Sequence, residues 1–348
     1  MEKELWEFHW EVPNDGYRWV HARPIQSSSV ELVHSDPDPT TGQVLIPASD
    51  VLAPSRRYAP LRDQTGLFRI LADVKLTPAG ILDFANRYGW LGHTRVAVHD
   101  PNPRLSDQSA TAPGETWMAW VDAIASLRLA VRLWEMARKG DAEGLAPYVH
   151  WADDDVVYCF SDPQWMHANP TQPLPPGERC WTMDRRWEDS NLNLRPGDRI
   201  VPARCAVQFE MNQHLSATTA RLLWNRKHTQ QELCFAPPHL MAAVWLQFAQ
   251  AVDGNKGYRN CQQCGRWFEL SPQAGRADKR FCRDACRSRA SRERQQQAVD
   301  MYQGGKPVAE IAQTLQSSTD VVRRWIKQSP RLAPRALAST PSLVRSQS

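Results

Sequence analysis

Apolar side chains recur at helical spacing over one long segment of this chain, between Glu115 and Lys139. The apolar positions of this segment are Met118, Val121, Ile124, Leu127, Val131 and Trp134. Steps of three or four residues place such side chains on one face of an α-helix. Gly140 follows the segment, and glycine commonly ends a helix. The pattern therefore predicts a helix over residues 115–139, the most clearly marked element of the chain.

Shorter patterns predict further elements around this helix. A capping Thr77 before Pro78 starts a predicted helix that ends near Tyr88. The other predicted helices cover Arg199–Gln213 and a segment from Pro237 to about Val252. The predicted strands are Trp6–Val12, Tyr17–His21 and Phe68–Val74, with a hairpin formed by Thr219–Trp224 and Gln231–Phe235. Helices mixed with strands predict an α+β fold for the body, residues 1–255.

The C-terminal part of the chain carries the pattern of a helix-turn-helix. Met301 lies near the end of a first helix, Pro307 starts a second, and Ser317 to Asp320 cap a third that ends at Lys327. The predicted shared core is Ile311, Leu315, Val322, Trp325 and Ile326. The positions left facing outward are Ser318, Thr319, Asp320, Arg323, Arg324 and Lys327. Because Arg and Lys contact guanine edges and phosphates, this outward face is a candidate nucleic-acid surface.

Charge is divided unevenly along the chain. Residues 1–255 carry 24 Lys/Arg against 31 Asp/Glu, whereas residues 256–348 carry 18 against 7, so that the net charges are −7 and +11. A basic C-terminal part predicts a polyanionic partner, with DNA expected and RNA as the alternative. Four arginines of one predicted helix are candidates for phosphate contacts: Arg287, Arg289, Arg292 and Arg294. A solvated basic face is the other interpretation of the same charges.

Four of the eight cysteines stand in this basic part as two close pairs, Cys261 with Cys264 and Cys282 with Cys286. Each pair can hold a metal ion from one local turn, and the loop between the pairs brings them together. Gly265 allows the tight turn after the first pair, and the second pair is spaced one helical turn apart. The spacing predicts a structural Zn²⁺ with all four positions filled, and Trp267, Phe268 and Phe281 as packing partners.

Two disulfides or four free thiols are the alternatives to this metal site. Disulfides need an oxidising compartment, but the chain opens with Met1–Trp6 and shows no basic stretch followed by an apolar one. We therefore expect a cytoplasmic protein with reduced thiols. No apolar run approaches the roughly 18–20 residues of a membrane span, so no membrane partner is expected. The remaining cysteines are widely spaced and are expected to be buried apolar residues: Cys159, Cys180, Cys205 and Cys234.

The C-terminal part of the chain resembles two known bacterial families. Residues 264–268 read Cys-Gly-Arg-Trp-Phe and residues 280–287 read Arg-Phe-Cys-Arg-Asp-Ala-Cys-Arg, which resembles the CGNR-like, treble-clef-like zinc finger of uncharacterised bacterial proteins. Residues 301–327 resemble the helix-turn-helix of resolvase-like DNA-binding domains. That family has Leu-Gly and an apolar residue at the turn, where this chain has Leu315, Gln316 and Ser317. The resemblance implies a DNA-binding regulator of transcription.

The body offers little that predicts catalysis. Its densest cluster of polar groups is His150 followed by Asp153, Asp154 and Asp155, which is more typical of a solvated turn than of a metal site. Enzymatic activity is therefore not expected, and the sequence indicates neither the role of the body nor the oligomeric state. The competing hypotheses are a metal-dependent hydrolase targeted to nucleic acid, and an adaptor whose basic part binds acidic proteins. The predicted domains are 1–255 (body), 256–296 (zinc module), 297–328 (helix-turn-helix) and 329–348 (a disordered tail).

Overall fold

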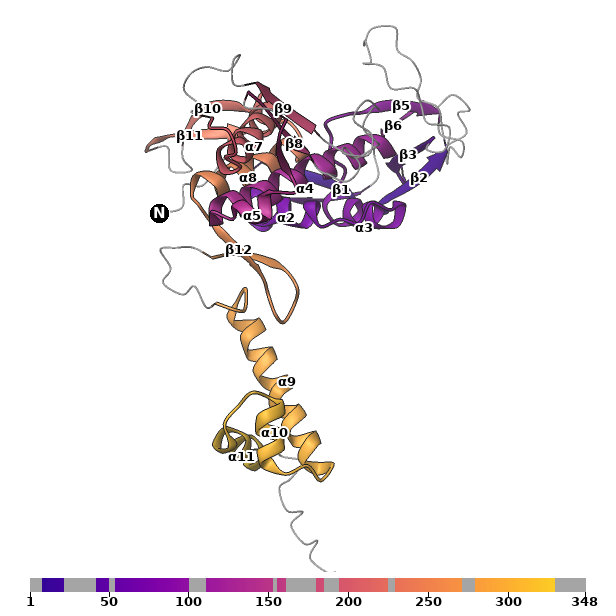
Figure 1. Cartoon of the computed structure of the whole chain (residues 1–348). Coiled ribbons are helices and arrows are strands. Elements are labelled where there is room, and N and C mark those ends of the chain that lie inside the picture. The colour runs from indigo at the N-terminus through magenta and orange to yellow at the C-terminus, as the bar shows by residue number, and fades with distance from the viewer. Residues whose placement is uncertain are drawn as a thin grey trace, which may run out of the picture. The chain divides into compact units, whose positions relative to one another are not determined.

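The protein is α+β, as predicted, and its structure is a computed structural model. The model describes residues 8–21, 42–49, 54–99, 111–152, 155–160, 180–184, 194–224, 229–270 and 279–328. The chain divides into two compact units. The body unit is residues 1–258 with 267–276, and the C-terminal unit is residues 259–266 with 277–348 (Figure 1). Residues 267–270, which the predicted zinc module included, belong to the body unit, and the predicted tail lies outside the described residues.

The strands of the body form small antiparallel sheets. Their bounds are β1 Trp10–Pro13, β2 Tyr17–His21, β3 Gln43–Pro47, β4 Ser55–Tyr58, β5 Val96–His99, β6 Thr111–Thr116, β7 Val149–Trp151, β8 Val156–Phe160, β9 Cys180–Asp184, β10 Thr219–Trp224 and β11 Gln231–Ala236. The sheets have the strand orders β2-β3-β6-β5, β7-β8-β9, β1-β4 and β10-β11. The predicted strand Tyr17–His21 and the predicted hairpin β10–β11 are confirmed. The strand predicted over 6–12 begins only at Trp10, and residues 1–7 lie outside the described residues.

Helices supply most of the core of the body. Their bounds are α1 Pro60–Asp63, α2 Leu67–Ala72, α3 Pro78–Tyr88, α4 Trp117–Lys139, α5 Ala142–Leu145, α7 Ile200–Leu215 and α8 Leu240–Asp253. The predicted helices α3, α4, α7 and α8 are all confirmed. The Thr116 hydroxyl caps the first turn of α4, and Gly140, in the left-handed conformation, ends it. Helix α4 packs against α2, α7 and α8 and buries Ile124 and Leu127 completely (Figure 1).

The strand predicted over Phe68–Val74 is wrong, because this segment contains the helix α2. Its apolar residues are contiguous, and such a run does not distinguish a buried strand from a buried helix. A distant side chain satisfies the backbone here. The Leu67 N–H donates to Gln247 Oε1 at 3.1 Å, and Gln247 Nε2 donates to the carbonyls of Pro60 and Gln64, each at 2.8 Å. Gln247 lies on α8, so the conformation depends on tertiary packing that the local pattern does not contain.

Three helices make up most of the described part of the C-terminal unit: α9 Asp284–Gln303, α10 Val308–Thr314 and α11 Thr319–Lys327. Their shared core is built on Ala298, Ile311, Ala312 and Val322, with Leu315, Trp325 and Ile326 packed against it. The predicted helices and their predicted core are therefore confirmed. The predicted domain boundary between residues 296 and 297 lies inside α9, because one continuous helix has Cys286 in its first turn and also packs against α10 and α11.

The turn between α10 and α11 is tight even though it lacks glycine. The Ser317 N–H donates to the Ala312 carbonyl at 2.9 Å, and the Gln316 N–H donates to the Gln313 carbonyl at 3.2 Å. These two bonds form a Schellman motif, which requires the left-handed conformation at Gln316. Gln316 has a φ of 48°. The sequence departs from the resolvase-like pattern at this residue, and the backbone adopts the glycine-like conformation at a cost of about 1 kcal/mol.

We expect Gln316→Gly to stabilise the C-terminal unit by about 0.5–1 kcal/mol. Glycine adopts the left-handed conformation without a steric cost, which its greater freedom in the unfolded chain only partly offsets. The measurement is amide hydrogen exchange of α10 and α11 in the intact chain, where protection should rise about two- to fivefold. Gln313→Gly is the matched control, because the same change inside the right-handed helix α10 should lower protection. Equal effects of the two substitutions would contradict the assignment of strain to Gln316.

Candidate metal centre

The first cysteine pair lies in a tight turn between β12, Gly257–Asn260, and β13, Trp267–Leu270. The Gly265 N–H donates to the Cys261 carbonyl, and the Cys261 N–H donates to the Arg266 carbonyl, each at 2.9 Å. Gly265 has a φ of 69°, and a Cβ at this position would meet no atom within 4 Å. Glycine is therefore needed here for its backbone conformation rather than for lack of space. This is the role that the sequence predicted for it.

The second pair lies at the start of α9. Cys282 precedes the helix and Cys286 lies in its first turn, where the Cys286 N–H donates to the Arg283 carbonyl at 3.1 Å. Backbone contacts hold the two pairs together, because the Gln262 N–H donates to the Arg280 carbonyl at 3.1 Å. A side-chain contact adds to them, since Gln263 Nε2 donates to both carboxylate oxygens of Glu293 on α9, at 2.9 and 3.0 Å.

All four sulfur atoms lie within 4.8 Å of one another. The Cys282 Sγ is 3.6 Å from the Sγ of Cys264 and 3.6 Å from that of Cys286. A tetrahedron with metal–sulfur distances of about 2.3 Å has sulfur–sulfur edges of about 3.8 Å. The four cysteines are therefore close enough to hold one metal ion. They form the one group of three or more His, Cys, Asp or Glu side chains with this property in the described part of the chain.

Three of the four thiols have shifted pKa values, and the shifts differ in direction. Burial opposes ionisation of Cys261, but N–H groups of Cys282, Cys264 and Gln263 donate to its sulfur and lower its pKa to about 6. The Arg266 N–H likewise lowers the pKa of Cys264. Burial and the neighbouring sulfurs raise the pKa of Cys282 to about 12. The turn thus favours thiolates on the first pair, while accumulated negative charge disfavours another on Cys282. A bound cation would relieve this repulsion.

The aromatic residues expected around the metal ion lie differently. Trp267 belongs to the body unit, where its indole N–H donates to Asp73 Oδ2 at 2.9 Å. Its ring lies 5.2 Å from the guanidinium carbon of Arg69. Phe268 also belongs to the body unit and is buried, whereas Phe281 is half-buried in the C-terminal unit. The contacts of Trp267 are therefore with Asp73 and Arg69 of the body, and its expected packing around the metal ion stays a prediction.

Arg69, which no sequence pattern marked as a functional residue, is the most enclosed cation among the described residues of the body. Its guanidinium lies 5.2–5.6 Å from the rings of Phe68, Trp134, Tyr258 and Trp267. Nη1 pairs with Glu135 Oε1 at 2.6 Å. Burial lowers the pKa of Arg69, and Glu135 opposes this shift. An arginine in an apolar run gives no local signal of such a role, because its partners come from four different elements.

The candidate nucleic-acid residues are on the surface of the C-terminal unit. Those of α9 are all exposed: Arg287, Arg289, Arg292 and Arg294. On and beside α11 the exposed ones are Ser318, Asp320, Arg323, Arg324 and Lys327, while Thr319 is half-buried. The Ser318 hydroxyl caps α11 by accepting from the Val321 N–H. Two of the arginines have acidic neighbours on their own helix, because Arg287 pairs with Asp284 and Arg323 with Asp320, each at 3.1 Å.

The histidines of the body do not form a metal site within the described residues. His214 stacks on Trp245 with a ring separation of 4.4 Å, and Glu210 accepts from Ser126, Trp181 and His214. Burial, reinforced by His239 and His214, lowers the pKa of His93 to about 4. Such mutually bonded groups are typical of packing. In the predicted acidic turn, Asp153 and Asp154 lie outside the described residues.

Comparison of the chain with protein-family models, with curated proteins and with solved structures finds no match. Among the described helices, none is both long enough and apolar enough to cross a membrane. The geometry of the site and of its surroundings therefore carries the functional argument.

We expect Cys264→Ser and Cys282→Ser each to abolish binding of one metal ion per chain. Three sulfurs cannot complete the site, and the metal stabilises a segment that buries little apolar surface. Elemental analysis measures the bound metal, and hydrogen exchange should show lost protection at 261–266 and in the first turns of α9. Cys180→Ser is the matched control, because Cys180 lies in β9 of the body and should leave the metal content unchanged. Unaltered metal content in both cluster variants would contradict the assignment.

Proposed function

We propose that the C-terminal unit holds a structural zinc ion and binds DNA, and that the chain acts as a regulator of transcription. The observation that carries the proposal is the exposed basic face of α11 on a small three-helix core. Within 259–266 and 279–328, the described part of the unit, thirteen Lys/Arg stand against five Asp/Glu, a net charge of +8. Such a concentration of positive charge favours a polyanionic partner.

Zinc is the metal we propose, on the chemistry of the donor set. Four thiolates in a tetrahedral arrangement are typical ligands of Zn²⁺ in structural sites. With four sulfurs bound, no position remains for water or substrate, so the ion would have no catalytic role. Its contribution would be to fold the turn at 261–266 onto the start of α9. The helix would then be fixed at one end by the metal and at the other by the core that it shares with α10 and α11.

The proposal for DNA rests on the two faces of α11. Val322 is fully buried and Trp325 and Ile326 pack beside it, which leaves Arg323, Arg324 and Lys327 on the solvent side. A helix held by its apolar face and offering arginines on the other is the arrangement that reads base edges in the major groove. The net charge of −7 on residues 1–255 makes the body an improbable contact for the same polyanion. The resemblance to resolvase-like helices supports the same proposal.

The ion pair between Arg323 and Asp320 bears on how such reading would work. Both side chains are largely exposed, so their pairing contributes little to stability and can be exchanged for contacts to bases. An aspartate beside the arginine also disfavours non-specific binding, because it repels phosphates. Arg323 would then be released only where a guanine offers it two acceptors.

We expect Arg323→Ala and Arg324→Ala to weaken binding to a selected duplex by roughly 1–3 kcal/mol and to change scrambled duplexes less. Lys327→Ala should weaken both duplexes alike and lower the salt slope of the binding constant by about one, because a lysine at the helix end would contact phosphate. The measurement is a competition assay with the full-length chain at several salt concentrations, after selection of the preferred sequence from a random library.

Lys139→Ala provides the control, because it removes an equal charge from the body and should not alter DNA binding. Equal losses on both duplexes for Arg323→Ala and Arg324→Ala would leave a non-specific nucleic-acid binder. No effect of any α11 variant would contradict the proposal and favour the adaptor hypothesis. A preference for single-stranded RNA over duplex DNA in the same assay would assign the surface to RNA.

A further inference from the structure

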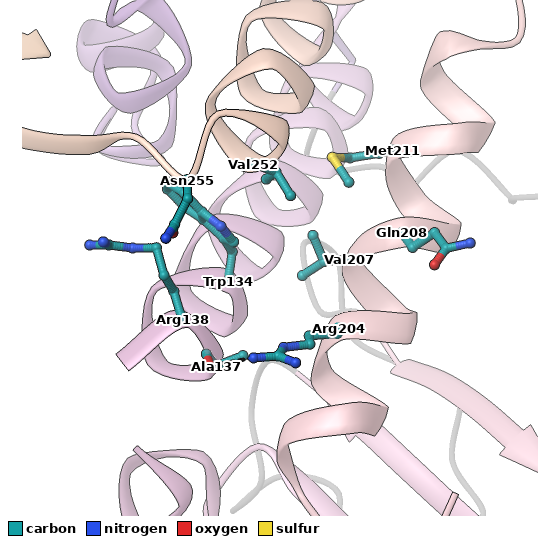
Figure 2. A pocket seen from close by; sticks show the side chains of 9 residues that line it. All are labelled: Trp134, Ala137, Arg138, Arg204, Val207, Gln208, Met211, Val252 and Asn255. Carbon is teal, nitrogen blue, oxygen red and sulfur yellow. Dashed lines mark hydrogen bonds between the residues drawn. The ribbon is translucent and has the colours of Figure 1, made fainter. Parts of the chain in front are cut away.

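A ligand-sized cavity of about 420 Å³ opens in the body between the ends of three helices. Trp134 and Arg138 line it from α4, Arg204 and Met211 from α7, and Val252 from α8 (Figure 2). Helix α7 packs against α4 and α8, so the cavity lies where three packed helices diverge. Its volume is within the range of about 300–1,000 Å³ that is usual for small-molecule sites.

The walls of this cavity combine an apolar floor with a cationic rim. In Figure 2 the side chains of Val207, Met211 and Val252 converge from two helices, beside Trp134. Arg204 extends across the opening toward Ala137, whose carbonyl oxygen lies 3.4 Å from Nη2. The guanidinium of Arg138 lies 5.5 Å from the Trp134 ring. No acidic side chain is among the residues that line the cavity, and no described carboxylate pairs with either guanidinium.

Partial charges do not cancel this positive rim. The C-terminal end of α4 carries about −0.5 of an elementary charge, but its last carbonyls are already satisfied. The Gly140 and Asp141 N–H groups donate to the carbonyls of Ala137 and Met136 at 3.3 and 3.0 Å. Two full positive charges therefore outweigh the helix end, and within the described part of the chain no carboxylate pairs with them.

We propose that this cavity binds a small organic anion, with an aromatic or aliphatic part over Trp134 and Met211 and a carboxylate or phosphate between Arg138 and Arg204. An apolar floor holds the body of such a ligand, and a guanidinium offers two parallel donors to either acid group. This inference does not rest on the proposed DNA binding, because every residue that lines the cavity belongs to the body unit.

The test is isothermal titration calorimetry of the full-length chain with three naphthalene probes: 1-naphthyl phosphate, 1-naphthoate and neutral 1-naphthol. We expect at least one of the two anions to bind, and naphthol to bind at least tenfold more weakly. Preference for the phosphate or the carboxylate assigns the acid group. Arg138→Gln and Arg204→Gln should each weaken binding of that anion about three- to tenfold, which is the effect of one partly exposed charge contact.

Lys139→Gln is the matched control for charge, because it removes the same charge one residue beyond Arg138 and should change affinity less than twofold. Val252→Phe fills the cavity without altering its charge and should weaken binding of the anion. Far-ultraviolet circular dichroism checks that every variant is folded. Leu222→Ala tests the exposed apolar hairpin β10–β11 as a competing site. The proposal is overturned if neither anion binds at millimolar concentration, if naphthol binds equally well, if Lys139→Gln matches Arg138→Gln, or if Leu222→Ala abolishes binding.

Discussion

Repulsion among four cysteine sulfurs is the constraint on which the C-terminal unit depends. With both sulfurs ionised, as a metal ion requires, Cys264 and Cys282 at 3.6 Å would repel by about 4–5 kcal/mol at an effective dielectric constant of 20 if no cation lay between them. Within 259–266 and 279–328 the unit has little apolar burial to offset several such terms, because the fully buried core residues there are few and mostly small: Ala298, Val299, Ile311 and Val322. A divalent cation at the centre reverses the sign of the interaction. The proposed zinc ion would therefore decide whether the turn at 261–266 stays folded against α9.

In the body, a single buried arginine contacts residues of several different elements. Arg69 lies among Tyr258 of β12, Trp267 of β13 and Trp134 of α4, and Glu135 neutralises its charge. The two strand residues stand on either side of the first cysteine pair in the sequence. Truncation of Arg69 would remove the cation that these three rings surround, while water would solvate the partly exposed Glu135. The same contact thus completes the core of the body and holds Tyr258 and Trp267, the body residues that precede and follow 259–266 in the sequence.

Much of this organisation could be predicted from the sequence where the cause is local. Helix α4 is marked by its apolar period and its terminal Gly140, and the four cysteines by their spacing. The rest depends on contacts between distant residues. The backbone N–H at the start of helix α2 donates to the side chain of Gln247, about 180 positions away in the sequence. Trp267 follows the metal-binding turn in the sequence but packs against Arg69. The cavity was not predictable either, because its two arginines come from helices that are separate in the sequence.

The position of the cavity gives its proposed ligand a route of influence within the body. Trp134 lines the cavity and also lies against Arg69, and Asn255 lines it from the short link between α8, which ends at Asp253, and β12. A ligand shifts an equilibrium only by its difference in affinity between two arrangements. An anion that draws Arg138 away from the Trp134 ring would change a neighbour of Arg69 directly. Coupling to the strands beside the metal-binding turn would then require no long pathway, since one indole and one guanidinium separate the ligand from Tyr258 and Trp267.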